Sequence, residues 1–301
     1  MVLLVPSCFA ADYAAAFLEN GVGSRGVGMG GAFVAAVDDA SASYWNPAGL
    51  LRSEGKGFMT VVQPMSLDRR QNSFSARLNL RDEFAFGFTW IHARVSDVVG
   101  RSAIGVPTGN IEDSQNAYQV AVARRLHPRL LVGAITKVME HEISVPWRGS
   151  NRGRGHGFDL GLQVLIYENA FLGVVVRNIN ADISWKVKQN NQQSTNTDDS
   201  LPQTLVLGLA HEPLEQMVLA TDVHIGDDTY FNLGFEWAVS PVLVLRGGLN
   251  RIPGDGISVN STTAGLSLRP MRMKSVQFHY TYATDPLNAG GRTVAGIAIT
   301  F

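Results

Sequence analysis

The chain has 301 residues, of which 45% are hydrophobic and 17% charged, and its formal net charge is −1 at pH 7. This balance excludes a strong global field that would steer nucleic acid or acidic partners to the protein. No apolar run reaches the roughly 18 residues that a membrane helix needs, so a helical membrane protein is excluded as well. A membrane β-barrel stays compatible with these numbers, because its strands alternate apolar and polar residues and average to a neutral hydropathy.

Residues 1–10 read as the second half of a secretory signal. They hold an apolar run, then Pro6, and then small residues at Cys8 and Ala10, in the −3 and −1 positions of a cleavage site. The positively charged start of such a signal is missing. Cleavage after Ala10 would remove the only cysteine, which suits an oxidising envelope compartment. A lipoprotein with an acylated Cys8 is the alternative, although residues 5–7 form a poor acylation sequence.

The next region, residues 11–56, is expected to form a plug or hatch. Its central part, 17–51, is packed with glycine and small residues and lacks a period of two. Glycine lets chains approach where a Cβ would clash, so we expect close backbone packing in a confined space. Asp38 or Asp39 is expected to cap a short helix over Ala40–Tyr44, which Pro47 would break.

Three glycines in this region, Gly26, Gly28 and Gly31, satisfy a G-x-G-x-x-G spacing. A dinucleotide fingerprint must follow a buried strand, open a helix and lead to an acidic residue within a βαβ unit. Here a glycine-rich stretch precedes the motif and expected antiparallel strands follow it. We therefore expect no nucleotide cofactor.

From about Phe58 to Phe301 the chain breaks into segments of about 9–11 residues, the length that crosses a bilayer as a tilted strand. Large apolar residues alternate with small or polar ones, as in 84–90, 158–166, 231–237 and 276–282. A period of two places the two sets on opposite faces of a sheet. The fourteen expected strands are roughly 58–67, 71–80, 84–93, 114–124, 130–140, 157–166, 170–186, 202–211, 216–225, 229–238, 242–250, 260–268, 274–284 and 293–301.

The connections between these strands alternate in length, except that 68–70 and 226–228 are short members of the longer set. Connections such as 81–83 are short, whereas 94–113, 141–156 and 187–201 are long. Outer-membrane barrels have short periplasmic turns on one rim and longer external loops on the other. We therefore predict an all-β transmembrane antiparallel barrel of about fourteen strands over residues 57–301, with both chain ends in the periplasm.

A soluble β-sandwich or propeller is the alternative fold. In it the large apolar face would pack inward, and alternation alone does not distinguish inside from outside. Two features favour lipid on the apolar side. The opposite face carries Gly, Ala, Thr, Asn, Gln and charges, which fill a dry core poorly. Aromatic residues also lie near strand ends, where membrane interfaces place them; they are Phe84, Trp90, Phe231, Trp237 and Tyr282.

The last expected strand ends the chain on Phe301, with Ile299 and Ile297 on the same face. This arrangement resembles the C-terminal signal by which outer-membrane barrels are recognised for insertion. An ordinary edge strand that happens to end the protein is the alternative interpretation.

Several charged residues fall on the lumen face of the expected strands. Opposite charges on neighbouring strands can pair there, where an unpaired charge would be costly. We interpret them as structural wall pairs or, functionally, as a polar filter or a latch that holds the hatch. The candidates are Arg77, Arg177, Asp222, His224, Glu236, Arg246 and His279.

Two histidine–acid groupings are present: His141 between two glutamates, Glu140 and Glu142, and His156 near Asp159. No H-E-x-x-H, cysteine-based metal spacing or G-x-S-x-G accompanies them. We therefore expect no metal, no cofactor and no enzymatic activity. Two loops are expected to be exposed. One carries a basic patch of Arg148, Arg152 and Arg154; the other, 187–201, is polar and flexible.

The N-terminal region also carries a longer pattern. It consists of Gly-Val-Gly-Met-Gly-Gly-Ala-Phe-Val-Ala at 26–35, Asp-Asp-Ala-Ser at 38–41 and Tyr-Trp-Asn-Pro-Ala-Gly-Leu at 44–50. Together these pieces resemble the start of the PorV/PorQ family, which is itself similar to the FadL long-chain fatty acid transporters. The resemblance implies a fourteen-stranded barrel whose N-terminal segment enters the lumen as a hatch. The implied hatch residues are Gly26, Gly28, Gly30, Gly31, Asp38, Asp39, Asn46, Pro47, Ala48 and Gly49.

The same resemblance implies a non-enzymatic role in the bacterial outer membrane, associated with type IX protein secretion. The expected partners are the lipid bilayer, the barrel-insertion machinery and secreted cargo proteins, with no nucleic acid. A FadL-like channel for long-chain fatty acids or other hydrophobic molecules is the alternative. The modest loops of this chain favour the PorV/PorQ branch, because FadL-type transporters have extended external loops.

Overall fold

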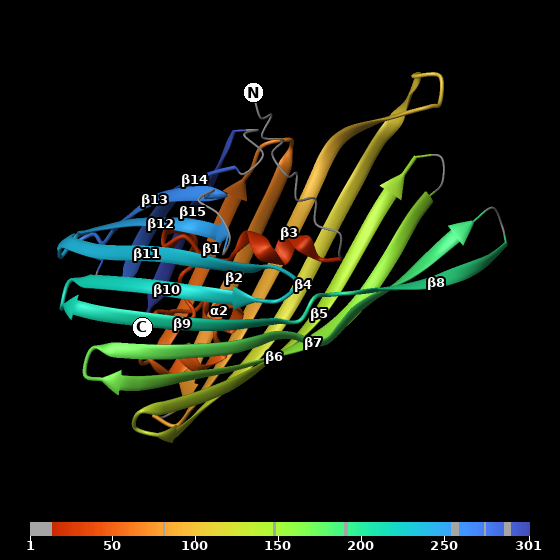
Figure 1. Cartoon of the computed structure of the whole chain (residues 1–301). Coiled ribbons are helices and arrows are strands. Elements are labelled where there is room, and N and C mark those ends of the chain that lie inside the picture. Colours follow the sequence, from red (N-terminus) through yellow and green to blue (C-terminus); the bar gives the residue numbers. More distant parts are fainter. Residues whose placement is uncertain are drawn as a thin grey trace, which may run out of the picture.

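The chain folds into one antiparallel sheet that curls into a closed barrel, as seen in a computed structural model (Figure 1). The structure describes residues 14–301 except 81, 147–148, 190–191, 254–258, 274 and 286–289. The expected signal segment, 1–10, therefore lies outside the described residues. The strands are β1 (Lys56–Pro64), β2 (Arg69–Leu80), β3 (Phe84–Arg101), β4 (Pro107–His127), β5 (Leu130–Val145), β6 (Gly149–Tyr167), β7 (Ala170–Gln189), β8 (Gln192–Ser200), β9 (Thr204–Leu214), β10 (Met217–Ile225), β11 (Thr229–Ser240), β12 (Leu243–Pro253), β13 (Ser261–Leu268), β14 (Val276–Thr284) and β15 (Gly291–Thr300).

Fourteen of these strands close the wall. In sheet order they run from β6 to β1, then from β15 to β9, then to β7, and the pairing of β6 with β7 completes the ring. β8 is an additional strand that pairs with the outer part of β7 and leads into β9. At the seam between β1 and β15, Lys56 and Phe301 exchange two backbone hydrogen bonds of 3.1 and 2.9 Å. The predicted antiparallel barrel is confirmed.

The two ends of the barrel differ. The turn end carries the connections 128–129, 168–169, 215–216 and 241–242 together with Phe301. At the opposite end, the loop end, β3 to β8 extend beyond the rest of the wall (Figure 1). β4 has 21 residues, whereas β10 has 9. One side of the loop end is therefore a tall sheet.

The tall sheet corrects three loop predictions. Residues 94–113, 141–156 and 187–201 were expected to be loops, but most of them belong to β3–β8. Cross-strand polar pairs support this region; Arg152 Nη2, for example, donates to Glu142 Oε1 at 3.0 Å. The apolar alternation stops here because these strands have left the lipid, so a pattern tuned to lipid contact does not reveal them.

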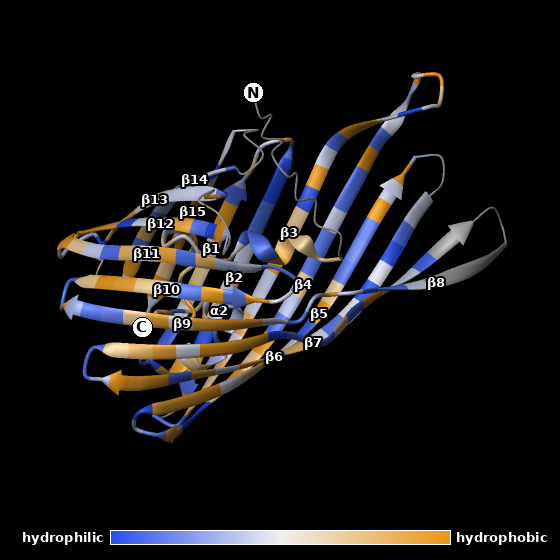
Figure 2. Ribbon diagram, viewed as in Figure 1, coloured by the Kyte–Doolittle hydropathy of each residue, from blue (hydrophilic) through white to orange (hydrophobic). Residues whose placement is uncertain are grey.

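Large apolar side chains cover the outer wall. On β3, Phe84 and Trp90 are exposed by 41% and 36%, whereas Ala85 is exposed by 1%. Apolar residues recur along the strands around the wall (Figure 2). Exposure of so extensive an apolar surface to water is unfavourable, whereas contact with a lipid bilayer is favourable. No helix among the described residues is long and apolar enough to cross a membrane.

Residues 14–55, here called the N-terminal segment, run lengthwise through the inside of the barrel. At the loop end, Glu19 pairs with Arg251; near the turn end, Arg52 Nη2 lies 3.1 Å from Glu212 Oε1. Both chain ends were predicted to lie at the same periplasmic rim; in the structure Phe301 lies at the turn end, whereas the described chain begins near the loop end. Its helical turns are η1 (Ala16–Asn20), α1 (Ser24–Gly28), α2 (Ala42–Trp45) and η2 (Pro47–Leu51).

The short helix expected near Ala40 is present but shifted. It begins at Ala42 and has no side-chain cap, because Asp39 Oδ1 instead accepts from the backbone N–H of Ser41 at 2.8 Å. Pro47 does follow its end, where it opens the 3₁₀ turn η2. A proline is well placed in a first turn, since its missing N–H would have no partner there.

Glycines let the segment touch the wall backbone directly. A Cβ at Gly248 of β12 would lie 2.3 Å from the backbone nitrogen of Gly30. Gly30 in turn has φ +65, and a Cβ there would lie 2.7 Å from backbone atoms of Leu233 and Leu249. Such contacts leave no room for any side chain. The wall glycines whose Cβ would come within 3.0 Å of the segment are Gly87, Gly133, Gly161, Gly173, Gly234 and Gly248.

Candidate functional site

The filled lumen is the candidate site, and Asp222 of β10 provides its most direct polar contact. Its Oδ2 accepts hydrogen bonds from the backbone N–H groups of Phe33 and Val34 at 2.8 and 3.0 Å. All three residues are fully buried. Hydrogen bonds to a carboxylate are stronger than neutral ones, so this side chain fixes the middle of the segment to the wall.

A series of ion pairs and hydrogen bonds joins α1 to the part of the wall formed by β11–β14. Arg25 donates two hydrogen bonds to Glu236, from Nε at 2.8 Å and from Nη2 at 3.0 Å. Glu236 Oε2 also accepts from Arg246 Nε at 2.5 Å. Arg246 then donates to the Ser267 hydroxyl, which lies 2.5 Å from His279 Nδ1. The segment is thereby connected to the ion pair of Glu236 and Arg246 on β11 and β12, and through it to polar side chains on β13 and β14.

Arg25 also contacts acids within the segment itself. It forms an ion pair with Asp38 and lies 3.8 Å from Asp39 Oδ2. Burial by itself would lower the pKa of Arg25, but the nearby Asp38 and Glu236 carboxylates outweigh it and raise that pKa well above its usual value. The guanidinium also lies 5.2 Å from the centre of the Phe33 ring. Arg25 is thus the central cation of the segment.

Two of the predicted lumen arginines bind carbonyl groups of the segment, as do Arg125 and Arg292. Arg77 donates to the carbonyls of Ser53 and Glu54 at 2.7 and 3.0 Å. Arg177 donates to the carbonyl of Trp45 at 3.2 Å. Helical turns leave such carbonyl groups without partners at their C-terminal ends, and a guanidinium satisfies them.

His224 differs from the other predicted lumen residues. It is buried, its ring stacks on Tyr230 with centres 4.4 Å apart, and its Nε2 lies 3.1 Å from Asn232 Nδ2. Its hydrogen bond and ring contact are both with wall residues. The structure therefore places it in the wall of the lumen, beside the segment rather than on it.

Several wall amides that anchor the segment were not predicted, although Asn46 of the segment itself was an expected hatch residue. Gln163 Nε2 donates to the carbonyl of Val34 at 3.0 Å, and Asn250 Nδ2 donates to that of Gly30 at 2.8 Å. Within the segment, Asn46 Nδ2 bonds the wall carbonyl of Leu162 at 3.0 Å. Gln163 and Asn250 occupy positions of the strand alternation that face the lumen. Because a polar side chain there needs a partner, the sequence could have identified both.

The remaining motif residues either pack within the segment or contact the wall. Gly26 lies under the Trp45 ring, which a Cβ would approach to 2.7 Å, and Gly49 lies against the Val37 carbonyl. Ala48 is fully buried, and its N–H donates to Asn46 Oδ1 at 3.2 Å. The motif residues that contact wall atoms are Gly28, Gly30, Gly31 and Pro47.

Two aromatic residues of α2 stand at the centre of the lumen. Trp45 donates from Nε1 to the carbonyl of Val22 at 2.7 Å and packs edge-on against Phe33. The hydroxyl of Tyr44 donates to the carbonyl of Leu18. Burial raises the pKa of Tyr44. These rings join the parts of the segment to one another.

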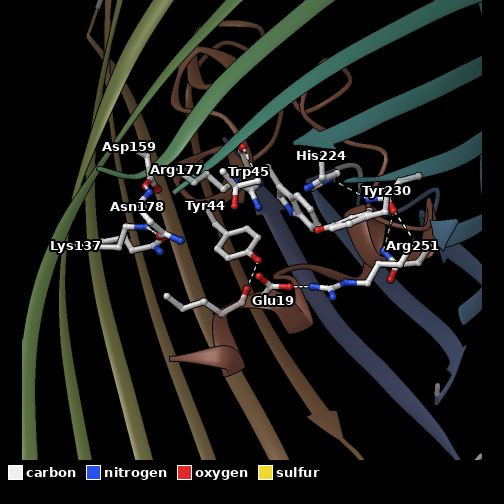
Figure 3. Close-up of a pocket in the computed structure, with 16 residues that line it drawn as sticks. Glu19, Tyr44, Trp45, Lys137, Asp159, Arg177, Asn178, His224, Tyr230 and Arg251 are labelled. Atoms are coloured by element: carbon white, nitrogen blue, oxygen red, sulfur yellow. Dashed lines mark hydrogen bonds and ion pairs between the residues drawn. The ribbon is translucent and has the colours of Figure 1, made fainter. Parts of the chain in front are cut away.

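Above α2, toward the loop end, lies a cavity of about 70 Å³ (Figure 3). Tyr44, Trp45 and Arg177 line it, together with His224 and Tyr230 from the short wall. An apolar cavity of about 150 Å³ is needed to hold a benzene ring. In this structure the cavity is therefore too small for an aromatic molecule.

Ion pairs bound this cavity on two sides. Lys137 Nζ lies 2.7 Å from Asp159 Oδ1, and each side chain is exposed by 3%. Glu19 pairs with Arg251 on the opposite side (Figure 3). Arg177 adds a positive charge between them. The cavity is thus polar at its rim and aromatic at its floor.

The histidine–acid groupings of the sequence form separate local pairs in the structure. Among the described residues no group of His, Cys, Asp and Glu could hold a metal ion. His141 Nε2 lies 2.9 Å from Asp113, and Asp159 pairs with Lys137 rather than with His156. The glycine motif opens the five-residue helix α1 after a 3₁₀ turn, without a preceding strand.

The expected basic loop patch is part of strand β6. Arg152 and Arg154 pair with Glu142 and Glu140, at 3.0 and 3.3 Å. Arg148 lies outside the described residues. The positive charge predicted for this loop is thus balanced by the neighbouring strand.

The final strand β15 forms the seam with β1. Ile299 lies opposite Phe58 in the register, and the Phe301 ring lies 6.2 Å from the Phe58 ring. Ile297 and Phe301 are exposed by 40% and 71% on the lipid-facing side. The insertion signal remains a prediction.

No protein-family model and no curated protein matches this chain. Solved structures do match. The toluene transporter TodX of Pseudomonas putida has a TM-score of 0.69 at 14% identity, over 94% of this chain and 99% of that one. The toluene transporter TbuX of Ralstonia pickettii has a TM-score of 0.66 at 15% identity, over 94% and 99%. A Pseudomonas aeruginosa FadL homologue has a TM-score of 0.61 at 11% identity, over 93% and 98%.

These similarities establish the fold. The chain is a fourteen-stranded β-barrel of the kind found in the bacterial outer membrane, and its apolar outer surface places it in that membrane. The comparisons do not confirm the resemblance of the N-terminal region to the PorV/PorQ family.

Proposed function

We propose that the protein is an outer-membrane channel for hydrophobic small molecules. One observation carries this proposal: a barrel with the fold of toluene transporters holds its own N-terminal segment in the lumen by non-covalent contacts. A filling that can move is what a gated pore requires.

The N-terminal segment then acts as the hatch. The cavity above it is smaller than a benzene ring requires, so passage needs the segment to move. The polar contacts that hold it are side-chain hydrogen bonds and ion pairs, each with a net contribution of about 0.5–3 kcal/mol, and apolar residues of the segment such as Leu50 pack with wall residues in one buried cluster. A backbone ladder does not fix it to the wall, since its elements are helical turns. Its displacement therefore leaves the barrel intact.

A disulfide lock tests the hatch. Ser24 Oγ in the segment lies 2.9 Å from Thr281 Oγ1 of β14, so a Ser24→Cys/Thr281→Cys pair is placed to crosslink segment and wall. The pair is made in a Cys8→Ser background, which removes the only native cysteine. Toluene entry into proteoliposomes is measured before and after reduction, with Ser24→Cys alone as the control.

We expect the oxidised double variant to lose toluene entry and to regain it on reduction. The single variant should behave alike under both conditions. Equal entry through the oxidised and reduced double variant, with the crosslink verified by mass spectrometry, would show that the segment need not move.

Protein docking of the PorV/PorQ type is the second candidate. The N-terminal resemblance favours it, and so does the tall sheet of β3–β8, which offers polar strand surface beyond the membrane. A pull-down from native outer membranes, analysed for proteins and lipids, separates the two functions. Recovery of a secreted protein in stoichiometric amount supports docking, whereas recovery of hydrophobic small molecules alone supports the channel.

A further inference from the structure

The outward side chains of β2 and β3 form layers that change character toward the loop end. In order, the directly opposed pairs are Phe74–Trp90, Asn72–His92 and Arg70–Arg94. Aromatic side chains such as Phe74 and Trp90 mark the level where a bilayer meets water. The two arginines, two layers further out, therefore lie at the level of lipid headgroups in the leaflet nearest the loop end.

The arginine pair is unusual because like charges face each other. Opposed side chains on neighbouring strands have Cβ atoms about 5 Å apart, and like charges at that distance are destabilising. Arg94 has one exposed acidic partner, Glu112, at 3.0 Å. No ion pair involves Arg70 among the described residues. The adjacent Arg69 is already paired with Asp285 at 2.8 Å.

A cavity of about 450 Å³ lies between the two arginines. It is also lined by His92, Asn72 and one acidic residue, Asp68. His92, which also lines the cavity, has its Nδ1 3.0 Å from Asn116 Oδ1. The lining combines the guanidinium groups of Arg69, Arg70 and Arg94 with an imidazole and an amide, all of which can donate hydrogen bonds.

We propose that this cavity binds the phosphate group of a lipid in the outer leaflet. A phosphate between the two guanidinium groups would accept paired hydrogen bonds and would cancel their repulsion. The lipid source follows from the direction of the site, which opens on the outer wall directly above lipid-facing aromatic rings. Phe74 and Trp90, each exposed by 36%, would contact the acyl chains of the same lipid.

The site is tested by lipid binding to the full chain in detergent micelles. Native mass spectrometry compares diphosphoryl lipid A with the same lipid after removal of its phosphates. The test variant is Arg70→Gln/Arg94→Gln. The matched control is Arg152→Gln/Arg154→Gln, which removes the same charge from exposed residues of the tall sheet that have their own glutamate partners.

We expect the test variant to bind diphosphoryl lipid A at least tenfold more weakly than the wild type, and the control to change by less than twofold. The wild type, the test variant and the control should bind the dephosphorylated lipid with the same affinity. Equal weakening in both variants would show diffuse charge attraction rather than a site. Saturation of the wild type by millimolar inorganic phosphate, with no added affinity for the lipid, would also overturn the proposal.

Thermal stability gives an independent measurement. In lipid-free detergent the test variant should melt no lower than the wild type, because the like-charge pair is gone. Addition of diphosphoryl lipid A should raise the melting temperature of the wild type and the control only. An equal rise in the melting temperature of the test variant would contradict the lipid-phosphate site. This result does not depend on whether the N-terminal segment acts as a hatch.

Discussion

Substitution of a single wall glycine should displace the hatch without damage to the barrel. Gly248 of β12 faces the lumen, and a Cβ there would lie 2.3 Å from the Gly30 nitrogen and 2.4 Å from the Met29 carbonyl carbon. Both are backbone atoms, which no rotamer change can move aside. In Gly248→Ala, the segment must therefore shift by about 1 Å to reach the 3.4 Å at which ordinary contacts begin.

The cost of this shift sets the size of the effect. Overpacking by one added carbon in a tightly packed region costs about 1–3 kcal/mol. Because the clash exists only while the hatch is seated, this cost falls on the closed state alone. A difference of about 1–3 kcal/mol corresponds to a roughly 5–150-fold change in the ratio of open to closed barrels.

Conductance of single barrels in planar bilayers measures that ratio. The control is Gly247→Ala, the adjacent residue on the same strand, which faces the lipid. Its Cβ would meet only the Phe235 ring, which can turn into the bilayer. We expect the open fraction to rise in Gly248→Ala and to stay at the wild-type level in Gly247→Ala. An unchanged open fraction in Gly248→Ala, or an equal rise in both variants, would refute the closed-state clash.

Three further predictions concern the polar contacts of the segment. In Asp222→Asn the charge that accepts two backbone N–H groups is lost, and we expect about 1–3 kcal/mol less stabilisation of the closed state, seen as a higher open fraction. Glu236→Gln leaves Arg25 and Arg246 without their shared carboxylate; we expect a loss of roughly 3–5 kcal/mol, seen as a lower temperature of the heat-induced mobility shift on gels. Tyr44 should ionise above the usual value of about 10, because burial raises its pKa. Stability from this group is then lost as the pH rises from about 10 toward the folded-state pKa; a difference ultraviolet titration against Tyr44→Phe should show that late ionisation, and a phenol that ionises near pH 10 in the folded chain would contradict it.

The barrel could be predicted because lipid imposes one rule on every strand. Residues such as Phe84 and Trp90 must face outward, so a period of two persists for as long as a strand is in the membrane. The same rule predicts Asp222 and Glu236 on the inner face, and both are buried and bonded to the N-terminal segment in the structure. It gave no information on the tall sheet, where water replaces lipid on both sides.

The partners of those inner residues could not be predicted. Glu236 meets Arg25 across 211 positions of sequence, and Asp222 meets Phe33 across 189. The N-terminal segment has no regular period from which a facing direction could be derived. Its glycines did indicate close packing, but the glycines on the other side of the contact, such as Gly248, resemble any strand glycine.

The lengthwise course of the N-terminal segment has a consequence for how the protein assembles. The segment enters near the loop end, leaves at the turn end beside Phe301, and continues directly into β1, one side of the seam. Close contacts with six wall glycines show that the segment fits tightly inside the closed ring. We therefore expect the strands to wrap around the segment, with the pairing of β1 and β15 as the final step. The N-terminal segment then also serves as the core around which the barrel strands assemble.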